Sequence, residues 1–328
     1  MKKKNLTYTY SHVSIENISQ DDQLTSFSLG TIVDSLQQSI EEIGIIHPIT
    51  LSPTEGRYRI VCGQRRVKIS SLLKIKEIPA KILDSKIDDQ SMLMLNLLEN
   101  QAHRHYSDIE KGLILSKLSK VKIPETRILE KYMPMIGLER SKKLLDDYLN
   151  ISSLTPGLQN LLHEMNIPLR ILSVFFYWDV ESTRAAEKFF SLLRPGMNKW
   201  RDILEWVDEI SKRDEIIPFD LFNLSELQSV LNQNDLAPNV QYDRIRQILH
   251  RRRYPMLSDL KVRLAKALDG MKLGDKTRVH VQESFESDEI RIEMKFRNRE
   301  QFVSQLEKLV RASDSEALDE LIRIFKNP

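Results

Sequence analysis

The sequence RYRIVCGQRR at residues 57–66 decides the architecture of the N-terminal part of this chain. Residues 57–62 are rich in β-prone side chains and favour a strand. Gly63 follows directly, and Val67 with Leu72 predicts a helix that begins near Gln64. A strand, a glycine and a helix N-terminus in this order predict a phosphate-binding turn. Glycine allows close backbone approach, and the first N–H groups of a helix have no internal partners.

The segments on either side of this stretch complete a small α/β domain. Apolar residues at helical spacing predict a helix over residues 31–43, which Gly44 ends. The predicted strands cover residues 12–16, 48–52, 57–62 and 78–83. The two central strands form a hairpin, because the segment between them contains Pro53 and Gly56. Strands that alternate with helices indicate an α/β arrangement.

Composition narrows the class of protein. The chain has 328 residues, 41% of them hydrophobic and 29% charged, which is typical of a globular protein with two or three domains. Its net charge of +2 means that any basic surface must come from local clusters. Cys62 is the single cysteine, which excludes an intrachain disulfide framework. No apolar signal segment follows Lys2–Lys4 and no window approaches about 18 consecutive apolar residues, so we expect a cytoplasmic protein without a membrane partner.

The pattern becomes helical after residue 88. Ser107 and Glu110 have the spacing of a capping box and predict the start of a helix. Helices continue to about residue 214, and near the C-terminus two alternating segments predict paired strands before an amphipathic helix. The predicted fold class is therefore multidomain α+β. We expect an α/β domain at residues 1–105, an all-α domain at 106–215, and a helical region at 216–328 that ends in a β-β-α module.

Arg65 and Arg66 add charge beside the glycine turn. Guanidinium groups present parallel N–H donors and stay charged, which suits the oxygens of a triphosphate. The string Gly-x-Arg-Arg is short, so an ordinary turn with two solvated arginines is the alternative interpretation.

Six short pieces of the sequence carry a resemblance to a known family. They are Leu36-x-x-Ser39-Ile40, Gly44-Ile45-Ile46-His47-Pro48-Ile49, Tyr58-x-Ile60-Val61-Cys62-Gly63-Gln64-Arg65-Arg66, Ile78-Pro79-Ala80, Glu99-Asn100 and Ile109-Glu110. In order and spacing they resemble the N-terminal domain of ParB-family partition proteins, which shares its broader fold with the sulfiredoxins. The likeness continues through a helix-turn-helix segment to about residue 180.

The resemblance implies a function. It implies a sequence-specific clamp for double-stranded DNA that is a homodimer, closes on CTP with magnesium and slides along the duplex. The C-terminal β-β-α end would dimerise. The resemblance also implies a nucleoid-associated role in chromosome or plasmid partition, with a Walker-type ATPase as a possible partner.

The same resemblance assigns the site residues. The nucleotide-binding set is His47, Gly63, Gln64, Arg65, Arg66, Glu99, Asn100, His103 and Arg104, and the metal-binding pair is Glu99 with Asn100. Three positions depart from the family. Gln64 replaces a glutamate, His47 replaces a glutamine, and His103 stands where the family has an arginine, with Arg104 one place later. The glutamate that the family has at this position could orient water or a metal ion, and Gln64 lacks that carboxylate. We therefore expect the chain to bind CTP and to hydrolyse it very slowly or not at all.

The helix-turn-helix segment supplies the candidate DNA contacts. Residues 128–133 would form the positioning helix, Gly137 the turn and residues 139–151 the recognition helix in the major groove. The predicted contacts are Arg140, Ser141, Lys142 and Lys143. One alternative is an ordinary helical hairpin with a charged outer face. Another DNA surface is the basic cluster of Arg244, Arg246 and His250 to Arg253, which could touch phosphates without reading sequence.

Two other classes of function compete with the clamp. The first is a sulfiredoxin-like or kinase-like enzyme that transfers phosphate and uses Cys62, although a free cysteine is more often a small core residue. The second is a DNA-binding transcriptional regulator whose nucleotide pocket is vestigial.

Overall fold

The computed structural model describes residues 6–29, 34–101, 104–233, 235–282 and 289–326. By its internal contacts the chain divides into two units, residues 1–211 with 215–238 and residues 212–214 with 239–328. The three-domain division expected from the sequence stays a prediction.

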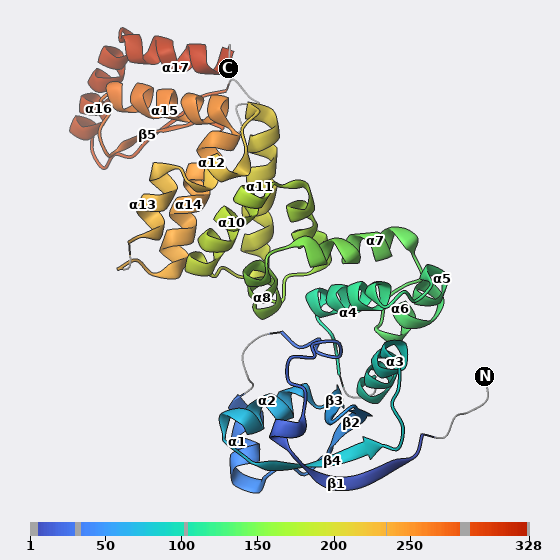
Figure 1. Ribbon diagram of the computed structural model, residues 1–328. Helices are drawn as coiled ribbons and strands as arrows, with labels where there is room; N and C mark the ends of the chain where they lie inside the picture. The colour runs from blue at the N-terminus through green and yellow to red at the C-terminus, as the bar shows by residue number, and fades with distance from the viewer. Residues whose placement is uncertain (1–5, 30–33, 102–103, 234, 283–288, 327–328) are drawn as a thin grey trace. The chain divides into compact units, whose positions relative to one another are not determined.

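A four-stranded mixed sheet forms the N-terminal part of the first unit (Figure 1). Its strands are β1 (Tyr8–Ser14), β2 (Ile49–Thr54), β3 (Arg57–Cys62) and β4 (Glu77–Leu83), in the order β1-β4-β2-β3. β2 and β3 form the predicted antiparallel hairpin, β2 is parallel to β4, and β1 is antiparallel to β4. The predicted strand at residues 12–16 is displaced, because β1 pairs with β4 from Tyr8 onward and Ile15–Asn17 is a 3-10 turn.

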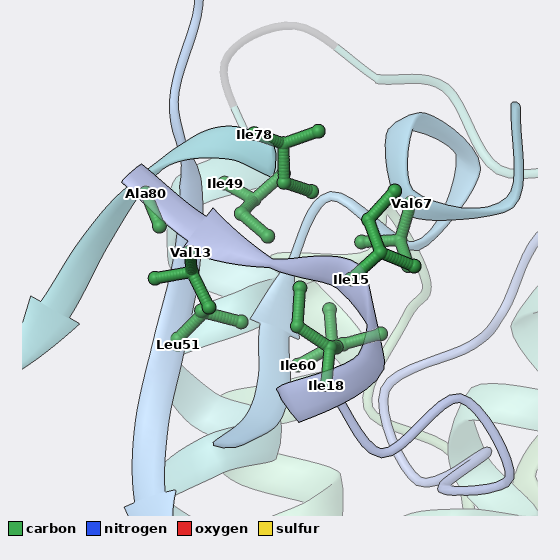
Figure 2. Packing of buried hydrophobic residues seen from close by; sticks show 9 residues of the cluster. All are labelled: Val13, Ile15, Ile18, Ile49, Leu51, Ile60, Val67, Ile78 and Ala80. Carbon is green, nitrogen blue, oxygen red and sulfur yellow. The ribbon is translucent and has the colours of Figure 1, made fainter. Parts of the chain in front are cut away.

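Three helices accompany this sheet: α1 (Asp34–Ile43), α2 (Gln64–Leu72) and α3 (Asp89–Asn100). The predicted start of the first helix, residues 31–33, lies outside the described residues. Aliphatic side chains from β1, the 3-10 turn, the central strands and α2 form one buried cluster, and Figure 2 shows them converging. Its members are Val13, Ile15, Ile18, Ile49, Leu51, Ile60, Val67, Ile78 and Ala80. This core fixes the junction between β3 and α2, where the predicted turn lies.

The rest of the first unit is helical. Its elements are α4 (Asp108–Lys120), α5 (Glu125–Arg127), η2 (Ile128–Tyr132), α6 (Met133–Met135), α7 (Lys142–Asn150), η3 (Ile151–Ser153), α8 (Pro156–Glu164), α9 (Leu169–Leu172), η4 (Ser173–Tyr177), α10 (Val180–Leu193), α11 (Met197–Asp214), α12 (Pro218–Phe222) and α13 (Ser225–Leu231). The predicted capping box is confirmed, because the Ser107 and Glu110 side chains each accept a hydrogen bond from the other residue's backbone N–H.

The segment expected to be a helix-turn-helix differs in detail from the prediction. Residues 128–132 form a π-helical turn, in which the Met133 N–H bonds the Ile128 carbonyl, and Pro134 follows in the first turn of α6. The expected recognition helix begins at Lys142 rather than at residue 139. Ser141 has an extended backbone and its Oγ accepts the Leu144 N–H, so it caps α7 from outside.

The second unit contains α14 (Pro238–Arg253), α15 (Pro255–Gly270), β5 (Thr277–His280), β6 (Arg291–Met294), α16 (Arg299–Ser313) and α17 (Glu316–Lys326). β5 and β6 are antiparallel, and α15 lies beside α17 in Figure 1. The predicted β-β-α order is therefore followed by one further helix, which supplies Leu321 and Phe325 to the core. Among the described residues, no helix combines the length and the apolar character needed to cross a bilayer.

Candidate functional site

The candidate site is built around Gly63, which joins β3 to α2. Gly63 has φ +106° and ψ +19°, a left-handed conformation that side chains with a Cβ adopt with strain. A Cβ placed there would lie 2.5 Å from Cγ2 and 2.9 Å from Cβ of Ile49, which is fully buried in β2. The turn therefore needs glycine for both conformation and space, and it exposes the N-terminus of the nine-residue helix α2.

Arg66 lies in the first turn of α2 and is engaged by the protein itself. Its guanidinium donates to the backbone carbonyls of His47 and Pro48, at 3.0 Å from the latter. Burial lowers the pKa of Arg66, and the nearby Glu99 carboxylate opposes that shift. His47 is exposed, and its backbone rather than its ring holds Arg66. The predicted residues His47 and Arg66 are thus brought together, through a contact that the sequence did not reveal.

Arg65 lies beside Arg104 and Glu110. Burial lowers the pKa of Arg65 first, the Arg104 charge lowers it further, and Glu110 acts in the opposite direction. Arg104 donates to Glu110 Oε1 at 2.6 Å and to Ser28 Oγ at 2.8 Å, and its guanidinium lies 4.9 Å from the centre of the Tyr106 ring. Two guanidinium groups near one buried carboxylate create positive potential, which suits an anionic ligand.

Glu99 faces the other side of the turn. Its Oε2 lies 3.5 Å from the Thr50 hydroxyl, and its charge influences both Arg66 and Cys62. Asn100 is turned back onto its own helix, because its amide nitrogen donates to the carbonyl and side-chain oxygens of Asn96 at 2.8 and 3.2 Å. Glu99 therefore lies near Arg66 of the turn, whereas the Asn100 amide nitrogen is bound within α3, and the metal-binding role of this pair stays a prediction.

The carboxylates near the turn decide whether a metal ion could be held there. Within the part of the chain that the structure describes, no group of three or more His, Cys, Asp or Glu side chains is arranged to hold an ion. A magnesium ion that arrives with phosphates needs only one or two protein carboxylates, which Glu99 satisfies. The chemistry of the donors fits Mg²⁺ bound jointly with a triphosphate.

Cys62 is a core residue. Its side chain is 2% exposed, and burial, followed by the Glu99 charge, raises the pKa of its thiol. A nucleophilic cysteine needs an accessible thiolate in an electropositive setting. This environment argues against the phosphotransfer alternative.

Gln64 contacts the segment that precedes α1. Its Nε2 donates to the Asp22 carbonyl at 3.1 Å and to Thr25 Oγ1 at 3.4 Å. His103, the third departure from the family pattern, lies outside the described residues. The sequence interpretation missed Thr50, Thr25 and Asp22, which stand in no recognisable motif. Glu110 was found as a capping residue, and the capping box gives no sign of its ion pair with Arg104.

The predicted DNA contacts gather before and at the start of α7. Arg140 and Lys143 are exposed, whereas Ser141 caps the helix. Lys142 forms ion pairs with Glu125 and, at 3.1 Å, with Asp146. Exposed Arg140 and Lys143 could therefore contact a phosphate directly, whereas Lys142 would first have to break its ion pairs with two carboxylates.

Comparison with known proteins shows which proteins the N-terminal part of the chain is similar to. A model of the ParB N-terminal domain matches residues 2–101. Over 138 residues the chain is 28% identical to the probable chromosome-partitioning protein ParB of Coxiella burnetii, which covers 42% of this chain and 45% of that protein. Over 86 residues it is 33% identical to the nucleoid occlusion protein of Halalkalibacterium halodurans, which covers 26% of this chain and 30% of that protein. The chain thus spans less than half the length of either relative.

Among solved structures, the C-terminally truncated chromosome-partitioning protein ParB from Caulobacter crescentus complexed with CTP-gamma-S aligns at 21% identity. The TM-score is 0.27, and the alignment covers 55% of this chain and 92% of that one.

The fold and the turn define a class of protein, an α/β domain that presents arginines around a left-handed glycine and is followed by helices. The family model gives this domain a more specific description. Residues 2–101, under a third of the chain, match the ParB N-terminal domain.

Proposed function

We propose that the chain is a ParB-like protein that binds CTP at the Gly63 turn and binds double-stranded DNA sequence-specifically, in chromosome or plasmid partition. The observation that carries the proposal is the turn itself, within a ParB N-terminal domain. Relatives described as a chromosome-partitioning protein and as a nucleoid occlusion protein support a task at the nucleoid. A homodimeric clamp and a Walker-type ATPase partner belong to the same proposal.

The turn would hold the phosphates in three ways. The N–H groups at the start of α2 point toward the space beside Gly63, where the helix dipole also favours an anion. Arg65 and Arg104 would supply guanidinium donors. Their charges already repel each other in the protein alone, and a bound phosphate would neutralise that repulsion. Glu99 would share Mg²⁺ with the phosphate oxygens, which supplies charge neutralisation.

DNA binding would use the start of α7. Exposed Lys143 and Arg140 could contact phosphates or base edges, since this is where a recognition helix meets the duplex. A symmetric dimer would match a palindromic site.

Equilibrium binding of fluorescent CTP, ATP and GTP to the full chain, with and without a DNA duplex selected from a random library, tests the proposal. Arg65→Ala should weaken CTP binding roughly 10- to 150-fold, since hydrogen bonds to charged groups contribute about 1.5–3 kcal/mol. Lys68→Ala is the matched control, because Lys68 is exposed in the same helix. Absence of any CTP-selective signal would remove the nucleotide part of the proposal.

A second candidate is a DNA-binding regulator with a vestigial pocket. Two arginines of the site already have internal partners, Arg66 on backbone carbonyls and Arg104 on Glu110. A pocket whose donors are satisfied internally has less to gain from a phosphate. This regulator would bind its DNA with the same affinity in the presence and absence of CTP, which separates the two candidates.

A further inference from the structure

Residues 22–28 form a segment that we call the strap. One end of the strap is fixed to β3: Arg59 Nε donates to Asp22 Oδ2 at 2.6 Å, and the Thr25 hydroxyl donates to the Ile60 carbonyl at 2.6 Å. Thr25 is 3% exposed. The strap is therefore a packed part of the domain, held by contacts far apart in sequence.

Gln64 holds the strap from α2. Its Nε2 faces two oxygens, the Asp22 carbonyl and Thr25 Oγ1, whose own proton goes to Ile60. Both oxygens can only accept at these contacts, so the group at position 64 must donate. A glutamate carboxylate would place its acceptor oxygens against these two acceptors. The amide is thus the side chain that this strap requires.

Lys117 holds the strap from α4. Its ammonium donates to the Gln23 carbonyl and, at 2.6 Å, to the Ser26 carbonyl, and it lies 5.2 Å from the centre of the Phe27 ring. Phe27 is 1% exposed. Arg104 adds a hydrogen bond to Ser28 at 2.8 Å. The strap therefore contacts the Gly63 turn on one side and α4 on the other.

The contact path continues from α4 to α7. A Cβ on Gly112 of α4 would lie 2.7 Å from the Tyr148 carbonyl, and the Tyr148 hydroxyl donates to Asp108 Oδ1 at 2.7 Å. Helices packed this closely move together rather than independently. A displacement of the strap would reach α7 through α4.

We propose that Gln64 and Lys117 are positioning residues that hold the strap between the Gly63 turn and α4, and that they thereby set how strongly a ligand at the turn affects DNA binding at α7. The coupling rests on the proposed function, because it requires a ligand at the turn. The holding of the strap does not, since every contact above exists in the protein alone. The hydrogen bonds to the strap thus explain why this chain has glutamine at position 64, where the family has glutamate.

The first experiment measures hydrogen–deuterium exchange of the strap in the full chain without nucleotide. Gln64→Glu, which conserves shape and removes the donor, should raise exchange of a peptide covering residues 20–29 about tenfold, as expected for two lost hydrogen bonds. Gln64→Met should give a smaller increase, because it adds no repulsion. Lys117→Met should also raise exchange, and Lys120→Met on the same helix is the control. Exchange equal to wild type in both Gln64→Glu and Lys117→Met would overturn the proposal.

The second experiment measures DNA affinity with and without CTP. The ratio of the two affinities in the wild type defines the coupling, and Lys117→Met should move this ratio toward one while each ligand still binds alone. A ratio unchanged from the wild type would refute the coupling. If wild-type protein does not bind CTP, the proposed function fails, whereas the exchange experiment still decides whether Gln64 and Lys117 hold the strap.

Discussion

Replacement of Gly63 by alanine tests the geometry on which the candidate site depends. The new Cβ would meet Cγ2 of Ile49 at 2.5 Å, and Ile49 is fully buried, so neither group can move into solvent. A left-handed non-glycine residue costs about 1–2 kcal/mol, and an extra methyl in a packed core costs about 1–3 kcal/mol. Alanine also restricts the unfolded chain, which returns about 0.4–1 kcal/mol.

Gly56→Ala is a matched control that isolates the steric term. Gly56 also has a positive φ, +76°, but a Cβ there would meet nothing within 4 Å. Strain and unfolded-state effects therefore largely cancel between the two variants, and Gly63→Ala should be the less stable by about 1–3 kcal/mol. Hydrogen exchange of peptides from β2, β3 and α2 measures this as a roughly 5- to 150-fold larger loss of protection. A difference below about 0.5 kcal/mol would refute the close approach of Gly63 to Ile49.

Three further predictions address charge. Lys143→Ala should reduce the slope of log affinity for DNA against log salt by about 0.9, and Lys142→Ala by less, because Lys142 is already paired with carboxylates; equal slopes would contradict this. Glu110→Gln should destabilise the first unit by about 1.5–3 kcal/mol in denaturant unfolding, since the partly buried guanidinium of Arg104 loses the charge of its 2.6 Å partner, and an unchanged midpoint would contradict it. Burial lowers the pKa of Lys117 to about 8 from 10.5, so the folded state loses its proton first. The stability of wild type relative to Lys117→Met should therefore rise from pH 8 to 10.5, and parallel pH profiles would contradict this.

Local sequence signals predicted the N-terminal domain well. The turn segment between β2 and β3, Gly63 after a strand, and the capping box at Ser107 each act over a few residues, so the pattern contains the whole cause. The start of α7 was placed too early, because residues 139 and 140 are compatible with a helix, whereas Ser141 adopts the extended backbone of a cap.

The contacts within the site could not be predicted in the same way. Arg66 bonds to backbone carbonyls of residues 47 and 48, and Arg104 pairs with Glu110 across a capping box. A backbone carbonyl has no sequence signature, and an ion pair depends on which side chains the fold brings together. Family resemblance therefore identified the residues of the turn but not their partners.

Gln64 illustrates how those partners alter an interpretation. By sequence alone, the exchange of glutamate for glutamine is a loss, because an amide cannot act as a base or bind a metal as a carboxylate does. In the structure, the same amide donates to Asp22 and Thr25, where a carboxylate would face two acceptors. Restoring the glutamate would therefore not simply restore a hydrolytic group, since it would also release the strap. A Gln64→Glu substitution therefore changes both the group available for hydrolysis and the hydrogen bonds that hold the strap. Hydrogen–deuterium exchange of the strap, measured without nucleotide, isolates the second effect from the first.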